Sequence, residues 1–314
     1  MKLSLAMKRS IPALILCLVA TTACSGTSDQ GPPPLVSTGG VTTGGHSHGG
    51  SLVSQPLTRY GGPVSVKMEV EPSAPQAGQQ FTISYTLNEA GQPLTLNKLQ
   101  ITHERPMHLI VVSKDLQYFS HLHPEEKGNG RYAVTTTIPK PGPYLLFNEF
   151  VTEKGITQYD RHEIKVAGEA AQGDAGTEKL EPTLGHVQQV GELSTLLAAD
   201  TVTVKRRVPT TFFLDVSKGG RPVMDLEPYL AAAGHIVIIS ADTTQFLHTH
   251  GEPHDPNVPH NHSATTHPLP PVRFGPQIEF THTFNTQPGL YKIWVQFIYG
   301  GKVVTVENTV EVLK

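Results

Sequence analysis

The chain has 314 residues, 16% of them charged, and its formal net charge at pH 7 is −3. A mildly acidic chain without a basic cluster argues against a nucleic-acid partner. Its only two cysteines, Cys17 and Cys24, stand near the N-terminus, which excludes a disulfide scaffold and a thiolate metal site from the rest of the chain. A metal site there has to use His, Met, carboxylate or backbone oxygen.

Residues 1–23 have the pattern of a bacterial lipoprotein signal peptide. Basic residues precede the apolar run "IPALILCLVA", and "TTAC" then places small residues directly before Cys24. We predict that the signal peptide is removed and that Cys24 carries a lipid, which anchors the protein to the membrane in the bacterial cell envelope, facing the extracytoplasmic side. Ser25 after the cysteine favours the outer membrane in a diderm cell. A non-lipidated secretory signal is the alternative.

Residues 24–63 are rich in Gly, Ser, Thr and Pro and contain few large apolar side chains. Such a segment cannot bury enough surface to offset the entropy lost on ordering, so a flexible tether is predicted. Its two histidines, His46 and His48, are interpreted as part of the solvated tether.

Two series of short strands follow, over residues 64–168 and 191–314, with a polar linker at 169–190. The first series includes "VSVKMEV", "FTISYTL", "MHLIVVS", "RYAVTTTI" and "YLLFNEFV", separated by Gly and Pro turns. Period-two alternation at this spacing is typical of antiparallel strands, and six or seven of them in about 100 residues predict an immunoglobulin-like sandwich. In the second series, "DLEPYLAAAGH" is expected to form one short helical turn. The predicted fold class is therefore all-β, with two tandem immunoglobulin-like β-sandwich domains after the signal peptide and tether.

The second domain repeats the first. Three histidines recur at an offset of 127 residues: His108, His121 and His123 become His235, His248 and His250. Farther along, "PGPYLLFNEF" (141–150) matches "PGLYKIWVQF" (288–297) at an offset of 147. The second copy therefore carries extra residues between the two blocks, in a His-rich loop at 252–275.

The spacing of each histidine trio predicts a metal site in each domain. His121 and His123 lie two apart on a strand, so both side chains point to one face. A tight hairpin near Asp115 places His108 opposite His123, with a Cβ separation of roughly 4.5–5.5 Å, provided that the strand register holds. The same construction applies to His235, His248 and His250.

Three imidazoles without a thiolate suit Cu(II) or Zn(II) better than Ca²⁺ or Mg²⁺, so copper is the expected metal and zinc the alternative. Glu149 and Gln296 occupy equivalent strand positions and are candidate hydrogen-bond partners of a ligating histidine. Weaker metal candidates lie in the His-rich loop: His254, His260, His262 and His267. His103, His162, His186 and His282 have no aligned counterpart and are interpreted as ordinary residues.

The blocks "MHLIVVSKDLQYFSHLHPE" and "LEPYLAAAGHIVIISADTTQFLHTHG" resemble the YtkA-like domains of secreted and lipid-anchored bacterial proteins. The resemblance covers about 60–70 residues of each half. It implies an immunoglobulin-type sandwich and an association with copper or other heavy metals. The second copy departs from it at Gly251, where the first copy has Pro124.

These patterns predict a lipid-anchored extracytoplasmic metal-binding protein. H-E-x-x-H does not occur in the sequence, and G-x-S-x-G occurs only as GHSHG (45–49), within the predicted tether, so no catalysis is expected. The alternative is a non-enzymatic interaction module that binds an envelope protein and whose histidines are structural.

Overall fold

The computed structural model describes residues 61–169, 179–254 and 269–314, and Gly45–Lys314 form one compact unit. The predicted signal peptide, the predicted lipidation site Cys24 and nearly all of the predicted tether lie outside the described residues. So does most of the His-rich loop, including His260, His262 and His267. Within the described ranges, no helix has the length and apolar character needed to cross a membrane.

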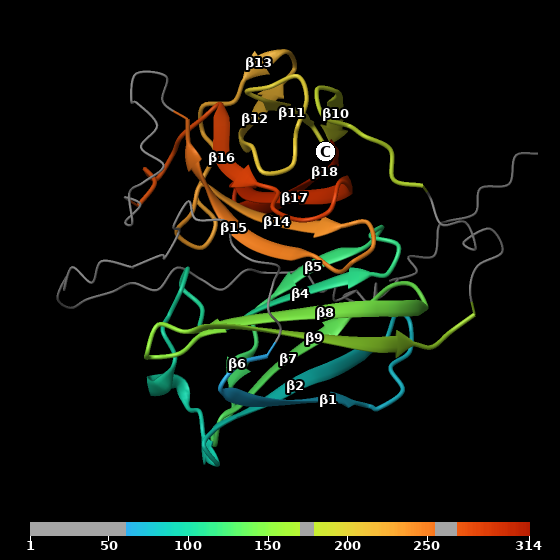
Figure 1. Ribbon diagram of the computed structural model, residues 1–314, viewed down its shortest axis with the longest axis vertical. Helices are drawn as coiled ribbons and strands as arrows, with labels where there is room; N and C mark the ends of the chain where they lie inside the picture. The colour runs from blue at the N-terminus through green and yellow to red at the C-terminus, as the bar shows by residue number, and fades with distance from the viewer. Residues whose placement is uncertain (1–60, 170–178, 255–268) are drawn as a thin grey trace, which may run out of the picture. The chain divides into compact units, whose positions relative to one another are not determined.

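The first domain is a sandwich of two antiparallel sheets (Figure 1). Its elements are β1 (Val64–Glu71), β2 (Gln80–Glu89), β3 (Gln92–Pro93), the 3-10 helix η1 (Leu96–Lys98), β4 (His108–Ser113), β5 (Phe119–Leu122), β6 (Glu125–Glu126), β7 (Arg131–Thr137), β8 (Gly142–Val151) and β9 (Thr157–Val166). One sheet has the order β1-β2-β7-β6, with β3 beside β2, and the other has the order β5-β4-β8-β9.

The second domain repeats this arrangement within one continuous nine-stranded sheet. Its strands are β10 (Val187–Val190), β11 (Leu193–Ala199), β12 (Pro209–Lys218), β13 (Arg221–Pro222), β14 (Gly234–Ser240), β15 (Phe246–Pro253), β16 (Gln277–Thr283), β17 (Gly289–Tyr299) and β18 (Lys302–Val312). The order is β10-β11-β12-β16-β15-β14-β17-β18, with β13 beside β12. The predicted class, all-β with two tandem immunoglobulin-like sandwiches, is confirmed.

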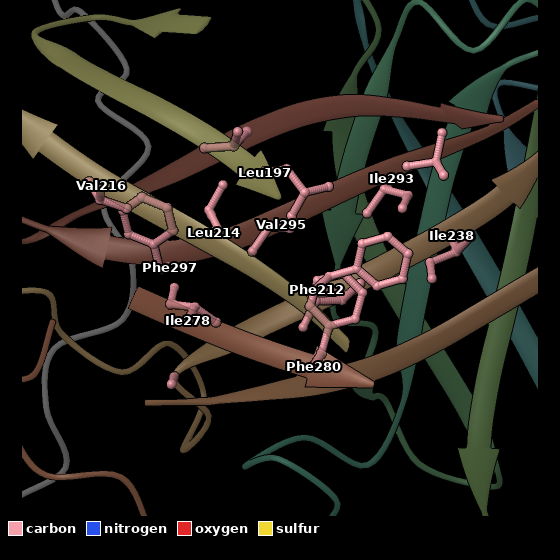
Figure 2. Packing of buried hydrophobic residues seen from close by; sticks show 14 of the residues in the cluster. Leu197, Phe212, Leu214, Val216, Ile238, Ile278, Phe280, Ile293, Val295 and Phe297 are labelled. Carbon is pink, nitrogen blue, oxygen red and sulfur yellow. The ribbon is translucent and has the colours of Figure 1, made fainter. Parts of the chain in front are cut away.

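Each domain has its own apolar core, built by the alternation that the sequence shows. Phe81, Ile83 and Tyr85 of β2 are all buried, as the period-two pattern predicts. Figure 2 shows the second core, where Phe212 from β12 stacks on Phe280 from β16 with ring centroids 5.1 Å apart.

Two local predictions differ from the structure. β10 begins at Val187, inside the segment predicted as linker. The stretch "DLEPYLAAAGH" is not helical, because Leu226 pairs with Phe274 and Glu227 pairs with Ile298, which keeps this backbone extended. The chain then turns tightly at Leu230 and Ala231, both at positive φ.

β4 and β14 are buried on both faces, which explains why each reads as a continuous apolar run. Leu109 and Val111 of β4 belong to the first core, whereas Ile110 and Val112 belong to a separate apolar cluster. That cluster also contains residues of the second domain. The apolar cluster joins the sheet that carries β4 to the sheet that carries β14. Its buried members are Ile110, Val112, Leu116, Leu145, Phe147, Val237, Ile239, Phe246 and Trp294.

Pro124 and Gly251 account for one difference between the domains. Pro124 has no backbone N–H to donate, and the first domain has two short strands, β5 and β6, on either side of it. In the second domain Gly251 lies inside the single strand β15, which pairs with β14 and then with β16. A Cβ at Gly251 would lie only 2.6 Å from Cγ2 of Ile278, so this close approach requires glycine.

Candidate metal centre

The strand register places the histidines as the spacing predicted. In the second domain His235 lies directly opposite His250 in the β14–β15 pair. In the first domain Leu109 pairs with Leu122. The next position in the same register sets His108 opposite His123. The side chains of both trios therefore share one face of their sheet.

The two trios meet at the interface between the domains, rather than on two separate surfaces as expected. Four buried histidines, His108, His121, His235 and His248, each place a ring nitrogen within 4.8 Å of one from each of the others. We call this set the four-histidine centre. Each domain supplies two of its members, so neither domain builds it alone.

Each of these rings has an inner nitrogen, which faces another ring of the centre, and an outer nitrogen, which lies against an oxygen acceptor. His108 Nε2 lies 3.0 Å from the carbonyl oxygen of Thr102, and His235 Nε2 lies 3.4 Å from that of Leu230. A carbonyl oxygen can only accept a hydrogen bond, so in the neutral rings Nε2 carries the proton and Nδ1 keeps its lone pair.

The other two rings take their outer hydrogen bonds from the opposite domain. His121 Nδ1 donates to Oε1 of Gln296 at 3.0 Å, and His248 Nδ1 donates to Oε2 of Glu149 at 2.8 Å. Gln296 is oriented for this role, because its Nε2 donates to the hydroxyl of Thr305. The expectation that Glu149 and Gln296 bond a histidine is therefore met, with each partner crossing the interface.

The inner nitrogens consequently face one another as lone pairs. His108 Nδ1 lies 3.1 Å from His121 Nε2, and His235 Nδ1 lies 3.2 Å from His248 Nε2. Two nitrogens that bind one tetrahedral ion at about 2.0 Å are about 3.3 Å apart, so the spacing already fits a shared cation. Without a cation or an added proton, these lone pairs repel each other.

Burial keeps the rings uncharged. It lowers the pKa of His108, His121 and His235 well below the usual range, with a further contribution from the neighbouring His248. Burial lowers the pKa of His248 itself to about 4. At neutral pH all four rings are therefore in the form that binds metal.

The family described as "Domain of unknown function (DUF8832)" matches residues 59–168 and again 188–314. The chain belongs to the DUF8832 family. The two matched segments correspond to the two sandwiches, and the four-histidine centre is thus shared by two DUF8832 domains. No curated protein matches the sequence.

Solved structures similar to this DUF8832 protein include bacterial adhesins. The Escherichia coli adhesin FdeC is 15% identical, with a TM-score of 0.26, covering 80% of this chain and 66% of that one. The Yersinia pseudotuberculosis adhesin InvE is 12% identical, with a TM-score of 0.23, covering 79% and 60%. The fibronectin(III)-like modules of Clostridium thermocellum CbhA are 11% identical, with a TM-score of 0.21, covering 79% and 93%. The DUF8832 chain spans less than two thirds of FdeC and InvE, and these similarities support no inference about activity.

Two residues of the predicted trios stand beside the four-histidine centre. His123 lies against His108 and His121, with ring centroids 5.1 and 4.6 Å away. Its Nε2 is buried and has no hydrogen-bond partner among the described residues. His250 belongs to a second candidate ligand group with His103 and His235.

His103 is the member of this region that the sequence prediction missed. Its ring stacks on that of His250 with centroids 3.3 Å apart, and it also approaches His235 edge-on at 5.2 Å. The repeat could not reveal it, because the second copy has Leu230 at the equivalent position. In the sequence, the feature that could have pointed to His103 was its position five residues before His108.

The described part of the His-rich loop stays apart from the four-histidine centre. His254, a weaker metal candidate, bonds Oε2 of Glu279 through Nδ1 at 2.5 Å. Its ring lies against Phe213 on the β12–β16 side of the sheet. The other loop candidates lie outside the described residues.

Proposed function

We propose that this DUF8832 protein binds one metal ion between its two domains and does not catalyse a reaction. The observation that carries the proposal is the set of four buried imidazoles whose outer nitrogens donate to oxygen, leaving the inner lone pairs directed at one another. Metal-ligating histidines characteristically have such outer hydrogen bonds.

Copper is the proposed ion, with zinc as the competitor. Four imidazole nitrogens suit Cu(II) and Zn(II), and nitrogen sites generally bind Cu(II) more tightly. Four protein ligands complete a tetrahedral or square-planar shell, and a site that keeps no open position is typical of binding rather than catalysis. One ion per chain is expected, in contrast to the two that separate trios would bind.

The proposal includes a place in the cell. The N-terminal sequence supports removal of residues 1–23 and lipidation of Cys24, which would hold the domains on the extracytoplasmic side of the envelope. The YtkA-like resemblance agrees with such a location and with copper. Metabolic labelling with a palmitate analogue should mark the full-length chain and fail with Cys24→Ala; equal labelling of that variant would contradict lipidation.

A second candidate is an interaction module for an envelope protein, in which the histidines only join the two domains. The observation that favours it is the apolar cluster beside the centre, in which Phe147 stacks on Phe246 across the interface at 4.7 Å. This interface is structural whether or not a metal binds.

Isothermal titration separates the two functions. Soluble protein, residues 25–314, is treated with a chelator and titrated with Cu(II) and, separately, with Zn(II). We expect about one equivalent at micromolar affinity or tighter, lost in His121→Gln/His248→Gln and kept in the matched control His186→Gln, whose histidine is exposed outside the centre. Binding no tighter than that of a short His peptide, with lower thermal stability of the double variant in metal-free buffer, would instead support the interaction module.

A further inference from the structure

The surroundings of the four-histidine centre differ between its two ends. At one end His103, His235 and His250 form a second group, in which each residue offers a nitrogen within 4.8 Å of the others. His235 is buried and shared with the four-histidine centre, whereas His103 and His250 are half-buried. We call this set the outer group, because two of its three residues are half-buried rather than fully buried.

The equivalent turn at the opposite end has the same backbone conformation, but it carries no counterpart of His103. His103 and Leu230 lie at equivalent positions of equivalent turns, with φ of 47° and 48°. The flanking pairs Thr102–Arg105 and Tyr229–Ala232 form the same isolated bridge in the two domains. The chain thus places a histidine in one turn and a leucine in the other, and among the described residues the outer group exists at one end only.

His235 is also the more loosely held of the two equivalent rings. Its Nε2 lies 3.4 Å from the carbonyl oxygen of Leu230, whereas His108 Nε2 lies 3.0 Å from that of Thr102. A hydrogen bond near 3.4 Å is weaker than one at 3.0 Å. The ring shared by both groups is therefore less restrained in its position than its counterpart.

We propose that the outer group is the route by which a metal ion enters and leaves the four-histidine centre. This inference rests on the function proposed above. All four ligands of the centre are buried, so an ion needs a path from solvent. His103 and His250 are placed for this role, because both residues are half-buried rather than fully buried and both lie against His235, a proposed ligand of the centre.

Sequential use of the two positions is favoured over simultaneous binding of two ions. Both groups need His235, so an ion in one position withdraws a ligand from the other. Two divalent ions in adjacent buried positions would also repel strongly, even with the Glu149 carboxylate bonded to His248 to offset part of their charge. The outer group therefore captures an ion and passes it inward.

The test compares uptake rates in variants that copy one turn into the other. His103→Leu gives the first turn the side chain that the second turn carries at the same φ, so the fold should be retained. Stopped-flow absorbance of Cu(II) mixed with metal-free protein should show uptake at least tenfold slower than in wild type. Stoichiometry should stay at one ion, and equilibrium affinity within about threefold, because a route changes uptake and release together.

Leu230→His supplies the converse variant. It gives the second turn the histidine that the first turn carries at the equivalent position, and we expect it to restore fast uptake when combined with His103→Leu. An uptake rate of His103→Leu within twofold of wild type would overturn the route. So would a fall in stoichiometry from two ions to one, which would mean an independent second site. Absence of tight binding in wild type itself would instead remove the proposed function.

Discussion

His121 and His248 each depend on the other domain for the hydrogen bond that fixes their ring orientation. His121 donates to Gln296 and His248 donates to Glu149, and these two acceptors occupy equivalent strand positions. Because a ligating ring must present one particular nitrogen, each domain holds half of the proposed ligands and orients half of the partner domain's. The centre is therefore complete only when the two domains are packed together.

The first prediction concerns Glu149, which is the charged one of the two side-chain acceptors Glu149 and Gln296. Glu149→Gln should weaken Cu(II) binding by about 10–100-fold, because an amide is a poorer acceptor for His248 and raises its basicity less. The fold should be retained, since Gln296 performs the equivalent role in the other half. Competition titration against a chelator of known affinity measures the change.

The matched control is Gln296→Glu, which places a carboxylate opposite His121. It should leave Cu(II) affinity unchanged or increase it. Equal affinities for Glu149→Gln and wild type would show that the carboxylate does not support a ligand.

At the scale of single residues, the sequence identified the histidines that recur and missed the one that does not. The repeat singled out all four members of the centre, together with Glu149 and Gln296. It could not show that the trios meet, because contact between domains leaves no period in a local pattern. His103 was passed over since position 230 is leucine, although the structure brings its ring against His250.

At the scale of elements, one residue decides whether two strand segments join. Pro124 separates β5 from β6, whereas Gly251 lies within the unbroken β15. The continuous strand pairs with β14 and β16, and so connects both sheets of the second sandwich. The sequence showed the Pro-to-Gly difference, but its effect depends on Ile278 of β16, which lies against the glycine.

The second prediction is that Gly251→Ala destabilises the second domain. The added methyl group would lie 2.6 Å from Ile278 Cγ2 and 3.1 Å from the carbonyl oxygen of Glu279, and neither can withdraw easily from a paired strand. Overpacking of this kind costs about 1–3 kcal/mol, which urea unfolding would measure.

Ile278→Ala provides the internal check, because it removes the crowding methyl group. The double variant should lose less stability than the sum of the single variants. Strict additivity of the two losses would show that the contact does not constrain β15.

Element type was easier to predict than element environment. The runs "MHLIVVS" and "HIVIIS" were correctly read as strands, and their lack of alternation is the mark of burial on both faces. The helical turn expected at "DLEPYLAAAGH" was wrong because its backbone bonds, through Leu226 and Glu227, to residues distant in sequence.

At the scale of the whole molecule, the aromatic contacts between the domains are reciprocal, as are the hydrogen bonds. Phe119 stacks on Trp294 with centroids 4.9 Å apart, and the equivalent Phe246 stacks on Phe147 at 4.7 Å. Each domain thus contributes the same pair of positions to the other, as in the self-complementary contact of a two-fold dimer. The apolar cluster and the four-histidine centre therefore form one continuous interface.

The third prediction tests this coupling. Phe246→Ala should lower the free energy of unfolding by about 3–5 kcal/mol, as expected for a buried aromatic residue, and should also weaken Cu(II) binding. Phe280→Ala, in the core of the second domain, should lower stability comparably while changing Cu(II) affinity less. The two variants are compared by urea unfolding and by titration of the folded protein. Equal losses of affinity would mean that the interface does not position the ligands.

The fourth prediction is that acid destabilises the metal-free protein. Burial, followed by repulsion from neighbouring histidines, lowers the pKa of His108, His235 and His250 well below 6.5. Such rings take up protons more readily in the unfolded chain, so stability is fully present above about pH 6.5 and is lost as the pH falls toward the folded values. Thermal unfolding in chelator should show a midpoint that is nearly constant above about pH 7 and falls steeply below about pH 6.

His121→Gln/His248→Gln should make this pH dependence shallower, because two of the neutral buried rings are removed. His186→Gln should leave it unchanged. A midpoint that did not change between about pH 7.5 and pH 5 would contradict burial of the neutral histidines.

Trp294 also provides an intrinsic fluorescence signal for the interface. It is the single tryptophan of the chain, it is 1% exposed, and it packs between the domains two residues before Gln296. Its fluorescence emission should therefore be blue-shifted while the interface is closed and move to longer wavelength when the domains separate. A nearby Cu(II) ion should quench that emission and Zn(II) should not. The fluorescence of one unlabelled sample would therefore report both whether the interface is closed and which of the two ions is bound.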